Sequence, residues 1–455
     1  MSRTVRKQYE KTIELLKKLN DSIPKVLERG NIQNGLDILQ ECQESAIGLG
    51  THMEKVIGTD SRTVRELEEY CENVYQLAEL IQSGQEGNDA GYKAIADSFT
   101  MVERIFEEEY PDKKEVVFLP YKASMWDSLE SVWRAADKEE NTIARVIPIP
   151  YFERDSDGNF AKEVWEGNEY PKDVPITRYD EYDLDLHHPD EIYIHNPYDE
   201  YNYVTSVHPD YYTPELKKCT EKLIYIPYFV LEEINPKNQI EIEPMKHFCF
   251  LPGTINADLV ILQSEDMKTI YVNEYYKEVL NRGMNETKDS IEKRFVGWGS
   301  PKFDKVRSTK KEDVEIPEDW LKRFVRPDGS WKKVILYNNS VSAFLQYKEN
   351  MLLKIRDVIR VFRERQDDVV MLWRPHPLMK QTIESMYPRL WREYEEIVEK
   401  YREESFGIYD DSSDLNRAIA VSDAYFGDRS SVVSLFEKGN KPVMIQAPSL
   451  TGLQH

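Results

Sequence analysis

The sequence predicts an α/β protein in which two doubly wound, Rossmann-type domains follow an all-α helical module. The first observation behind this prediction is an apolar residue at every third or fourth position over residues 4 to about 109, which is the period of packed helices. The second is that short apolar runs alternate with helix-length stretches from residue 115 onward, in two successive series. The runs are mostly continuous, as in parallel strands that helices cover on both faces.

The helical module, assigned to residues 1–112, is expected to contain four helices. Breaks at Gly30-Asn31, at residues 58–60 and around residues 84–91 divide it, and Asp60 or Ser61 is suited to cap the third helix. Its apolar stripes are longer than one edge of a β/α domain would cover, so we expect it to join copies of the chain into a homo-oligomer. The alternatives are a docking site for another protein and an appendage that only packs on the rest of the chain.

The first β/α series is assigned to residues 113–310. It contains a helix-compatible stretch over residues 124–140, and Asp157-Gly158 indicates a hairpin turn. Its expected strands are the apolar runs at residues 115–120, 144–152, 191–196, 222–229 and 257–263.

The second series is assigned to residues 311–455. Ligands of doubly wound sheets bind beyond the carboxyl ends of the strands, so the residues directly after each strand, and the cleft between the two domains, form the expected site. The expected strands, with helices between them, are residues 333–339, 369–373, 406–411, 423–428 and 442–446.

Composition excludes several classes of protein. Among 455 residues, 60 Lys and Arg stand against 83 Asp and Glu, a formal charge of −23, so general binding to nucleic acid or to acidic lipid is not expected. The four cysteines lack metal-ligand or redox spacing, and no stretch resembles a signal peptide or a transmembrane segment. We therefore expect reduced thiols and a cytoplasmic protein that holds any anionic ligand in a local pocket of donors.

An anion-binding arrangement follows the strand expected at residues 423–428. Ser430 and Ser431 open the next helix, so backbone N–H groups at its N-terminus, the helix dipole and two hydroxyls can hold a diphosphate beside Asp428. Arg429 adds a positive charge. The alternative is that Ser430 only caps the helix.

A second polar group follows the strand expected at residues 369–373. Arg374 and His376 leave the sheet at its ligand-binding edge, and Pro375 and Pro377 fix the backbone around them. Arginine recognises phosphate through a planar fork, and histidine can donate or carry a proton near neutral pH. A histidine that is simply hydrogen-bonded is the alternative.

These motifs resemble those of the CDP-glycerol glycerophosphotransferase family, the teichoic acid polymerases and primases. The family's C-terminal half is similar to RPHP at residues 374–377 and to YDDSSDLNRAIAVSDAYFGDRSSVVSLFEKGNKPVMIQ at residues 409–446. Its interdomain segment is similar to GWGSPKFD at residues 297–304, and the first strand of its nucleotide domain is similar to KVILYNNS at residues 333–340. The resemblance implies a GT-B fold, with His376 at the active site and residues 428–431 on the phosphates of the donor.

The sequence departs from the family in three places. The family's N-terminal domain has a His-Gly-Thr-Pro-Leu-Lys segment with a catalytic histidine, whereas residues 222–233 here contain no histidine, and His195 is the nearest physical substitute. An interior structural role for His195 is equally compatible with the sequence. Arg429 replaces the family's tyrosine. The chain ends soon after residues 442–446, where the family continues, so either it is a fragment or its site is completed differently.

Two lysines and several carboxylates complete the candidates. Lys122, after the strand at residues 115–120, and Lys302 are possible phosphate contacts, with a surface role as the alternative for Lys122. The carboxylates at residues 155–157 and 183–185 mimic metal-binding pairs, but carboxylates are abundant in this chain and these lie in loops, so we expect solvated turns there. His187-His188 has no third ligand at a recognisable spacing, and no metal and no cofactor are expected.

The resemblance implies a transferase that moves glycerol phosphate from CDP-glycerol to a hydroxyl of a bacterial surface-polymer precursor, as in teichoic acid or capsule synthesis. The donor lies in the C-terminal domain, and a polyol-phosphate or glycan acceptor lies in the N-terminal domain. A GT-B glycosyltransferase that uses a sugar nucleotide, and a catalytically silent nucleotide-binding or scaffold protein, are the alternatives. The expected location is the cytoplasm, up to the inner face of the membrane.

Overall fold

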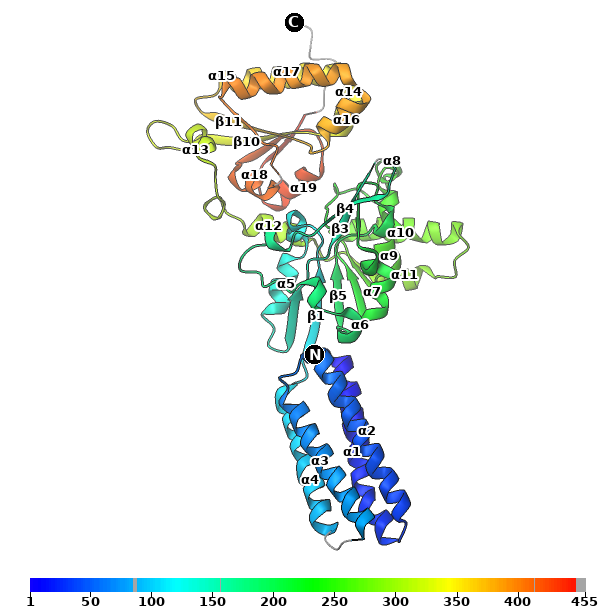
Figure 1. Cartoon of the computed structure of the whole chain (residues 1–455). Coiled ribbons are helices and arrows are strands. Elements are labelled where there is room, and N and C mark those ends of the chain that lie inside the picture. The colour runs from blue at the N-terminus through cyan, green and yellow to red at the C-terminus, as the bar shows by residue number, and fades with distance from the viewer. Residues whose placement is uncertain (85–87, 156, 413, 447–455) are drawn as a thin grey trace. The chain divides into compact units, whose positions relative to one another are not determined.

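The computed structural model describes residues 1–84, 88–155, 157–412 and 414–446 (Figure 1). The chain divides into two compact units. The first contains Met1–Ala123, Trp133–Tyr225 and Leu251–Leu259, and the second contains Ser124–Val132, Ile226–Phe250 and Val260–His455.

The first unit begins with an antiparallel helical bundle, whose helices lie side by side in Figure 1. Ser2, Asn31 and Ser61 accept hydrogen bonds from the first turns of the helices that they precede, which satisfies N–H groups that have no partner within the helix. These boundaries confirm the four predicted helices and the cap at Ser61. The bundle consists of α1 (Arg3–Glu28), α2 (Ile32–Ile57), α3 (Arg62–Ser83) and α4 (Asn88–Glu109).

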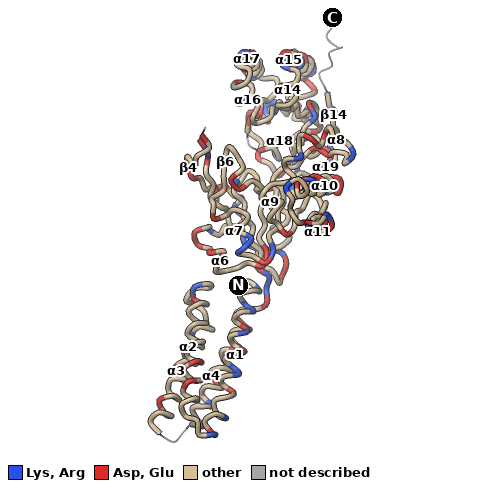
Figure 2. The backbone as a smooth tube through the Cα atoms, turned by 90° about the vertical axis from the view of Figure 1, so that its right-hand side faces the viewer, with Lys and Arg blue, Asp and Glu red and all other residues tan. Residues whose placement is uncertain are grey.

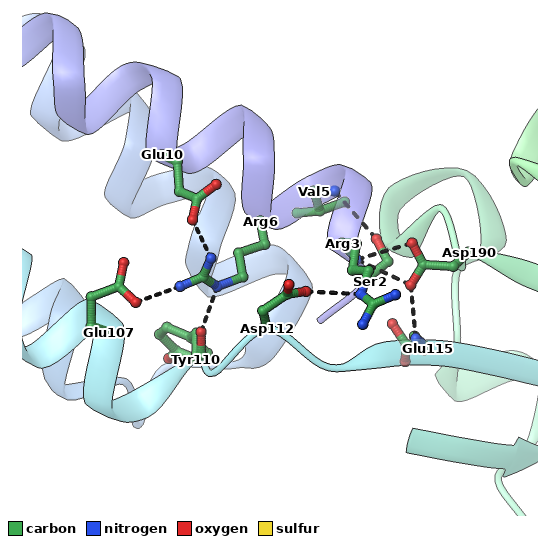
Figure 3. A network of polar contacts seen from close by, with 10 residues as sticks. All are labelled: Ser2, Arg3, Val5, Arg6, Glu10, Glu107, Tyr110, Asp112, Glu115 and Asp190. Atoms are coloured by element: carbon green, nitrogen blue, oxygen red, sulfur yellow. Dashed lines mark hydrogen bonds and ion pairs between the residues drawn. The ribbon is translucent and has the colours of Figure 1, made fainter. Parts of the chain in front are cut away.

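The bundle carries charged residues of both signs along its length (Figure 2), and Arg6 holds its end together. The buried Arg6 guanidinium donates to the Tyr110 carbonyl at 2.7 Å and to the Glu107 carboxylate at 2.6 Å (Figure 3). The bundle is also fastened to the sheet that follows, because Asp190 accepts from the backbone N–H groups of Arg3 and Glu115.

The first sheet has the strand order β2-β1-β5-β7-β8-β9. β1 pairs in parallel with β2 and β5, as do β5 with β7 and β8 with β9. The chain returns across β1 on its way from β2 to β5, so the direction of winding reverses between β1 and β5. The strands are β1 (Lys114–Leu119), β2 (Thr142–Val146), β5 (Glu191–Ile194), β7 (Lys222–Tyr225), β8 (Leu259–Ile261) and β9 (Phe295–Val296).

One predicted strand, residues 144–152, is two strands in the structure. Pro148 and Pro150 cannot donate to a ladder, and they separate β2 from β3 (Tyr151–Arg154). β3 lies in a separate antiparallel sheet, β4-β3-β6, with β4 (Phe160–Val164) and β6 (Thr205–Val207). Gly158 has a φ of +84° in the predicted hairpin turn between β3 and β4.

Helices of 4 to 17 residues connect these strands and lead into the second sheet. They are α5 (Glu130–Asp137), α6 (Leu184–His187), α7 (Thr213–Leu216), α8 (Gln239–Ile242), α9 (Pro252–Asn256), α10 (Glu265–Asn281), α11 (Lys288–Arg294), α12 (Pro301–Ser308) and α13 (Glu318–Phe324).

The second sheet, in the second unit, has the parallel order β12-β11-β10-β13-β14. The chain winds from β10 through β11 to β12 and then crosses back to β13, so its winding reverses between β10 and β13. The strands are β10 (Lys333–Asn339), β11 (Val369–Pro375), β12 (Ile408–Tyr409), β13 (Ala424–Gly427) and β14 (Val443–Ile445).

Helices cover both faces of this sheet (Figure 1). Leu336 and Leu372 face the core beneath α18 (Leu415–Val421) and α19 (Ser431–Lys438). Their neighbours Tyr337 and Trp373 face the opposite core, beneath α14 (Val341–Tyr347), α15 (Glu349–Glu364), α16 (Met379–Met386) and α17 (Pro388–Glu404). Burial on both faces explains why the strands are continuous apolar runs.

The structure confirms the predicted fold class, a helical module followed by two β/α series with parallel sheets. The bundle ends at Glu109 and β1 begins at Lys114. The domain boundaries after residues 112 and 310 stay predictions.

Candidate functional site

Polar residues gather at the carboxyl ends of β11, β10 and β13, where the winding of the second sheet reverses. Asn338 of β10 is level with Arg374 of β11 and with Gly427 of β13 in the strand register. Residues that follow these strands therefore meet at one edge of the sheet. This is the place where doubly wound sheets bind their ligands.

Asn338 joins the three strand ends. Its side-chain amide donates to the Arg374 carbonyl at 2.8 Å, and its Oδ1 accepts from the Ser430 hydroxyl at 3.1 Å. The backbones approach so closely that a Cβ at Gly427 would lie 2.2 Å from the Asn338 carbonyl oxygen, and Gly427 has a φ of +149°. Glycine is therefore required at this position.

Asp428 is buried, and its carboxylate is fully engaged. Oδ1 accepts from the Lys354 ammonium at 2.6 Å, and Oδ2 accepts from the Ser340 backbone N–H at 2.9 Å. Lys354, on α15, is itself buried and also donates to the Gln446 carbonyl after β14. The Lys354–Asp428 ion pair therefore fixes the ends of β10, β13 and β14 relative to one another.

The N-terminus of α19 opens at this edge. Ser430 precedes the helix with an extended backbone, and its side chain makes no capping hydrogen bond because its hydroxyl is directed to Asn338. Ser431 is exposed in the first turn. The first turn of α19 thus retains backbone donors and the positive end of the helix dipole, as an anion site requires.

Arg429 is exposed beside this helix terminus, and carboxylates of the second unit hold it. Its guanidinium lies 2.5 Å from the Glu232 carboxylate and 3.3 Å from that of Glu241. Burial raises the pKa of Glu232, while the neighbouring Arg429 lowers it. The positive charge predicted for the site is therefore already balanced.

Arg374 is buried and directed away from solvent. It forms an ion pair with Asp410, directly after β12, and donates to the Ser412 carbonyl at 2.6 Å. Its guanidinium holds the loop at the end of β12.

His376 is exposed at the same edge. Its backbone N–H donates to the Asn339 carbonyl at 3.0 Å, and its Nδ1 accepts from the Leu378 backbone N–H at 3.1 Å. The neutral ring must then carry its proton on Nε2. Partial desolvation by surrounding protein atoms lowers the pKa of His376 below its ordinary value.

His195 and Lys122 belong to the first unit, at the reversal between β1 and β5. His195 follows β5, is fully buried, and accepts at Nε2 from the Tyr121 backbone N–H at 3.1 Å. The half-buried Lys122 follows β1, and its ammonium lies 4.9 Å from the centre of the Tyr151 ring. Sequence reasoning thus selected residues that follow strands at the carboxyl-end edge of both sheets.

Lys302, on α12, is held by a carboxylate. Its ammonium lies 2.5 Å from Asp127, which also accepts from the Asn416 side chain at 3.0 Å. This contact fastens α12 to residues 124–132 and α18 within the second unit.

No group of His, Cys, Asp and Glu suited to a metal ion occurs in the described part of the chain. The candidate carboxylates have structural tasks: Asp155 accepts from backbone N–H groups in the β3–β4 turn, and Asp183 caps α6. His187 stacks on Tyr182. Nor is any helix within the described ranges long and apolar enough to cross a membrane.

Asn338, Ser340, Lys354 and Asp410 were not singled out by the sequence. Asn338 to Ser340 form a polar cluster directly after an apolar strand, which is a usable signal. Lys354 gives no such signal, because one lysine on an amphipathic helix is indistinguishable from a surface residue.

Residues 253–453 match the sequence model of a family described as CDP-Glycerol:Poly(glycerophosphate) glycerophosphotransferase. The match spans all strands of the second sheet and the polar edge described above, and it confirms the resemblance to this family over that part of the chain. It supports a transferase that uses a nucleotide-activated donor.

Several solved structures are similar to the chain at low identity. For S. aureus MnaA with UDP, the identity is 13% and the TM-score 0.41, over 73% of this chain and 78% of that chain. For UDP-GlcNAc 2-epimerase from Neisseria meningitidis bound to UDP-GlcNAc, the values are 10% and 0.37, over 73% and 82%. For the catalytic domain of starch synthase IV from Arabidopsis thaliana, bound to ADP and acarbose, they are 12% and 0.33, over 69% and 78%. A comparison with curated proteins finds no match to the sequence.

Proposed function

We propose that this chain transfers glycerol phosphate from CDP-glycerol to a hydroxyl group of a polyol-phosphate or glycan acceptor. The observation that carries the proposal is the N-terminus of α19, which Ser430 does not cap with its side chain and which lies at the reversal point of the second sheet. The family match includes this segment.

The donor diphosphate would bind at the first turn of α19. Backbone N–H groups and the exposed Ser431 hydroxyl are donors for its oxygens, and the helix dipole favours its negative charge. His376 contributes an Nε2–H donor from the adjacent strand end. Arg374 and Asp428 act as positioning residues, since both are buried in ion pairs that hold the surrounding loops.

The reaction would be a phosphoryl transfer. The acceptor oxygen attacks the phosphorus that carries glycerol, the bond from that phosphorus to the bridging oxygen breaks, and CMP leaves with the electron pair. The acceptor proton passes to a general base. Donors fixed around the phosphorus stabilise the charge that develops on its oxygens.

The acceptor side is assigned to the β1–β5 edge of the first sheet, where Lys122 and His195 lie. A cation between tyrosine rings suits a phosphate-bearing acceptor. Since His195 Nε2 already accepts from Tyr121, its role is to order this edge.

A nucleotide-binding protein without turnover is the second candidate. The engagement of His195 Nε2 favours it, because this nitrogen of the candidate base already accepts a backbone hydrogen bond. The released nucleotide separates the candidates: CMP marks glycerol phosphate transfer, a nucleoside diphosphate marks sugar transfer, and binding without release marks the silent protein.

The donor site is tested by calorimetry with CDP-glycerol. Replacing Ser430 and Ser431 together by alanine should weaken binding by about 1–3 kcal/mol, or roughly 5- to 150-fold. Ser308→Ala, at an exposed serine on α12, is the matched control. Unchanged affinity in a folded double variant would remove the donor assignment.

A further inference from the structure

A groove runs between α2 and α3 of the helical bundle. Its volume is about 320 Å³, and Ala46 and Gly50 of α2 form part of its wall opposite Leu67 of α3. The small α2 residues leave this space open. Ile47 and Tyr75, which also line the groove, are 54% and 46% exposed, so large apolar surface at its edge contacts solvent.

Carboxylates line this groove together with its apolar residues. Glu54, Glu68 and Glu72 line it, and none of them forms an ion pair with another described residue. Within Ile32–Ile57 and Arg62–Ser83 together, the sequence has nine acidic and three basic residues. An occupant of the groove must therefore combine an apolar side chain with flanking positive charge.

Helix α1 of the same bundle has this combination. Within Arg3–Glu28 the sequence has seven basic and four acidic residues. Lys7, Lys11, Lys18 and Lys25 are exposed and form no ion pair with the described residues. Their spacing of four, seven and seven residues places them on one face of the helix.

Leu15 supplies the apolar side chain on this face. It is 45% exposed, and it lies four residues after Lys11 and three before Lys18, so all three are neighbours on the helix surface. The face is directed away from the bundle core: Leu16, which is fully buried, lies about half a turn around the helix from Lys7 and Lys25. The lysines of one chain therefore cannot occupy the groove of that chain.

We propose that the bundle is a self-association module in which the lysine face of α1 in one copy binds the α2–α3 groove of a second copy. Leu15 enters the groove between Ile47 and Tyr75, and Lys11 and Lys18 face the carboxylates that line it. The contact removes apolar surface from water and pairs charges that the isolated chain leaves unpaired.

A second copy uses both surfaces, whereas other occupants use one. An anionic lipid surface would attract the lysines and repel the groove, and a basic peptide of another protein would fill the groove and leave α1 exposed. Complementary charge on the same bundle favours the contact between copies. This inference is independent of the proposed transferase activity.

Sedimentation velocity on the full chain tests the contact. At ~50 mM salt and up to ~100 µM protein we expect species above the monomer mass, and at ~500 mM salt a shift toward the monomer. Glu68→Lys with Glu72→Lys should weaken association at least ~10-fold, because the groove then repels α1. The matched control is Glu395→Lys with Glu399→Lys, the same change at two exposed positions four residues apart on α17, and it should leave association unchanged.

A charge-swap mixture is the decisive experiment. Lys11→Glu with Lys18→Glu should also prevent self-association. Mixing this variant with the Glu68→Lys and Glu72→Lys variant should restore a complex, because the charges of the two surfaces are then opposite again. Circular dichroism monitors folding, and glutamine at the same positions replaces any reversal that unfolds the chain. Three results would each overturn the proposal: a wild type that stays monomeric at ~100 µM and ~50 mM salt, a Glu68→Lys with Glu72→Lys variant that associates like the wild type, or a mixture that stays monomeric. This holds even if the lysines bind anionic vesicles or the groove binds a basic peptide.

Discussion

Lys354→Met should destabilise the second unit strongly. The change leaves the Asp428 carboxylate buried, at 3% exposure, with the Ser340 N–H as a remaining donor and with no cation in the place of the ammonium at 2.6 Å. Removing one partner of a buried ion pair leaves an uncompensated charge and costs about 3–5 kcal/mol. This is a large fraction of the free energy of unfolding of a typical domain, about 5–15 kcal/mol.

The double variant Lys354→Met with Asp428→Asn isolates the cause. Asparagine can still accept from Ser340, and the charges are removed together, so the double variant should lose less stability than the sum of the single variants, with a coupling of about 2–3 kcal/mol. Urea unfolding followed by tryptophan fluorescence measures these losses, since Trp373 is fully buried in the same sheet.

Lys322→Met, at an exposed lysine of α13, is the control and should change stability by less than about 0.5 kcal/mol. A loss of less than about 1 kcal/mol in Lys354→Met, or additive effects in the double variant, would refute the reasoning.

Three further predictions follow from single residues. His376→Ala should lower turnover by ~10²-fold with little change in the thermal midpoint, because the ring is exposed; a matching loss of stability would indicate a structural role. Burial raises the pKa of Asp199 to about 7, so between pH 4 and 7 the folded state binds more protons than the unfolded state. The free energy of unfolding should therefore fall by ~2–4 kcal/mol as the pH rises from 4 to 7, and it should stay low above pH 7. Asp199→Asn should remove this pH dependence, as measured by urea unfolding at each pH. Gly427→Ala should lower the urea midpoint by more than Gly329→Ala, because both glycines have a positive φ but only at Gly427 would an added Cβ contact Asn338. Equal losses of stability would show that the backbone φ alone matters.

The sequence predicted those parts of the fold that depend on the spacing of apolar residues and on the residues that cap or end helices. The bundle and the strands of the second sheet follow from apolar spacing, from breaks at glycine and from capping residues such as Ser61. The small sheet of β3, β4 and β6 was not predicted, because it depends on Pro148 and Pro150 interrupting what reads as one apolar run.

The sequence predicted where the candidate site residues lie in the fold, but not which side chains they contact. Arg374, His376 and residues 428–431 do lie at one sheet edge, as strand ends in a parallel sheet must. Which side chains remain open there depends on partners distant in sequence: Asp428 binds Lys354, 74 residues before it, and Arg374 binds Asp410, 36 residues after it. No local pattern encodes these pairs.

The carboxylates around Arg429 have a kinetic consequence. A free arginine at the mouth of a phosphate site accelerates the approach of an anion through long-range attraction, which salt suppresses. Here Glu232 and Glu241 already cancel that field, and the chain as a whole is strongly acidic. An anionic nucleotide should then be repelled at long range and held only at short range, so its association rate, measured by stopped flow, should rise modestly with ionic strength as salt screens the repulsion. A steep decrease with salt would show instead that Arg429 exchanges its carboxylates for solvent before the ligand arrives.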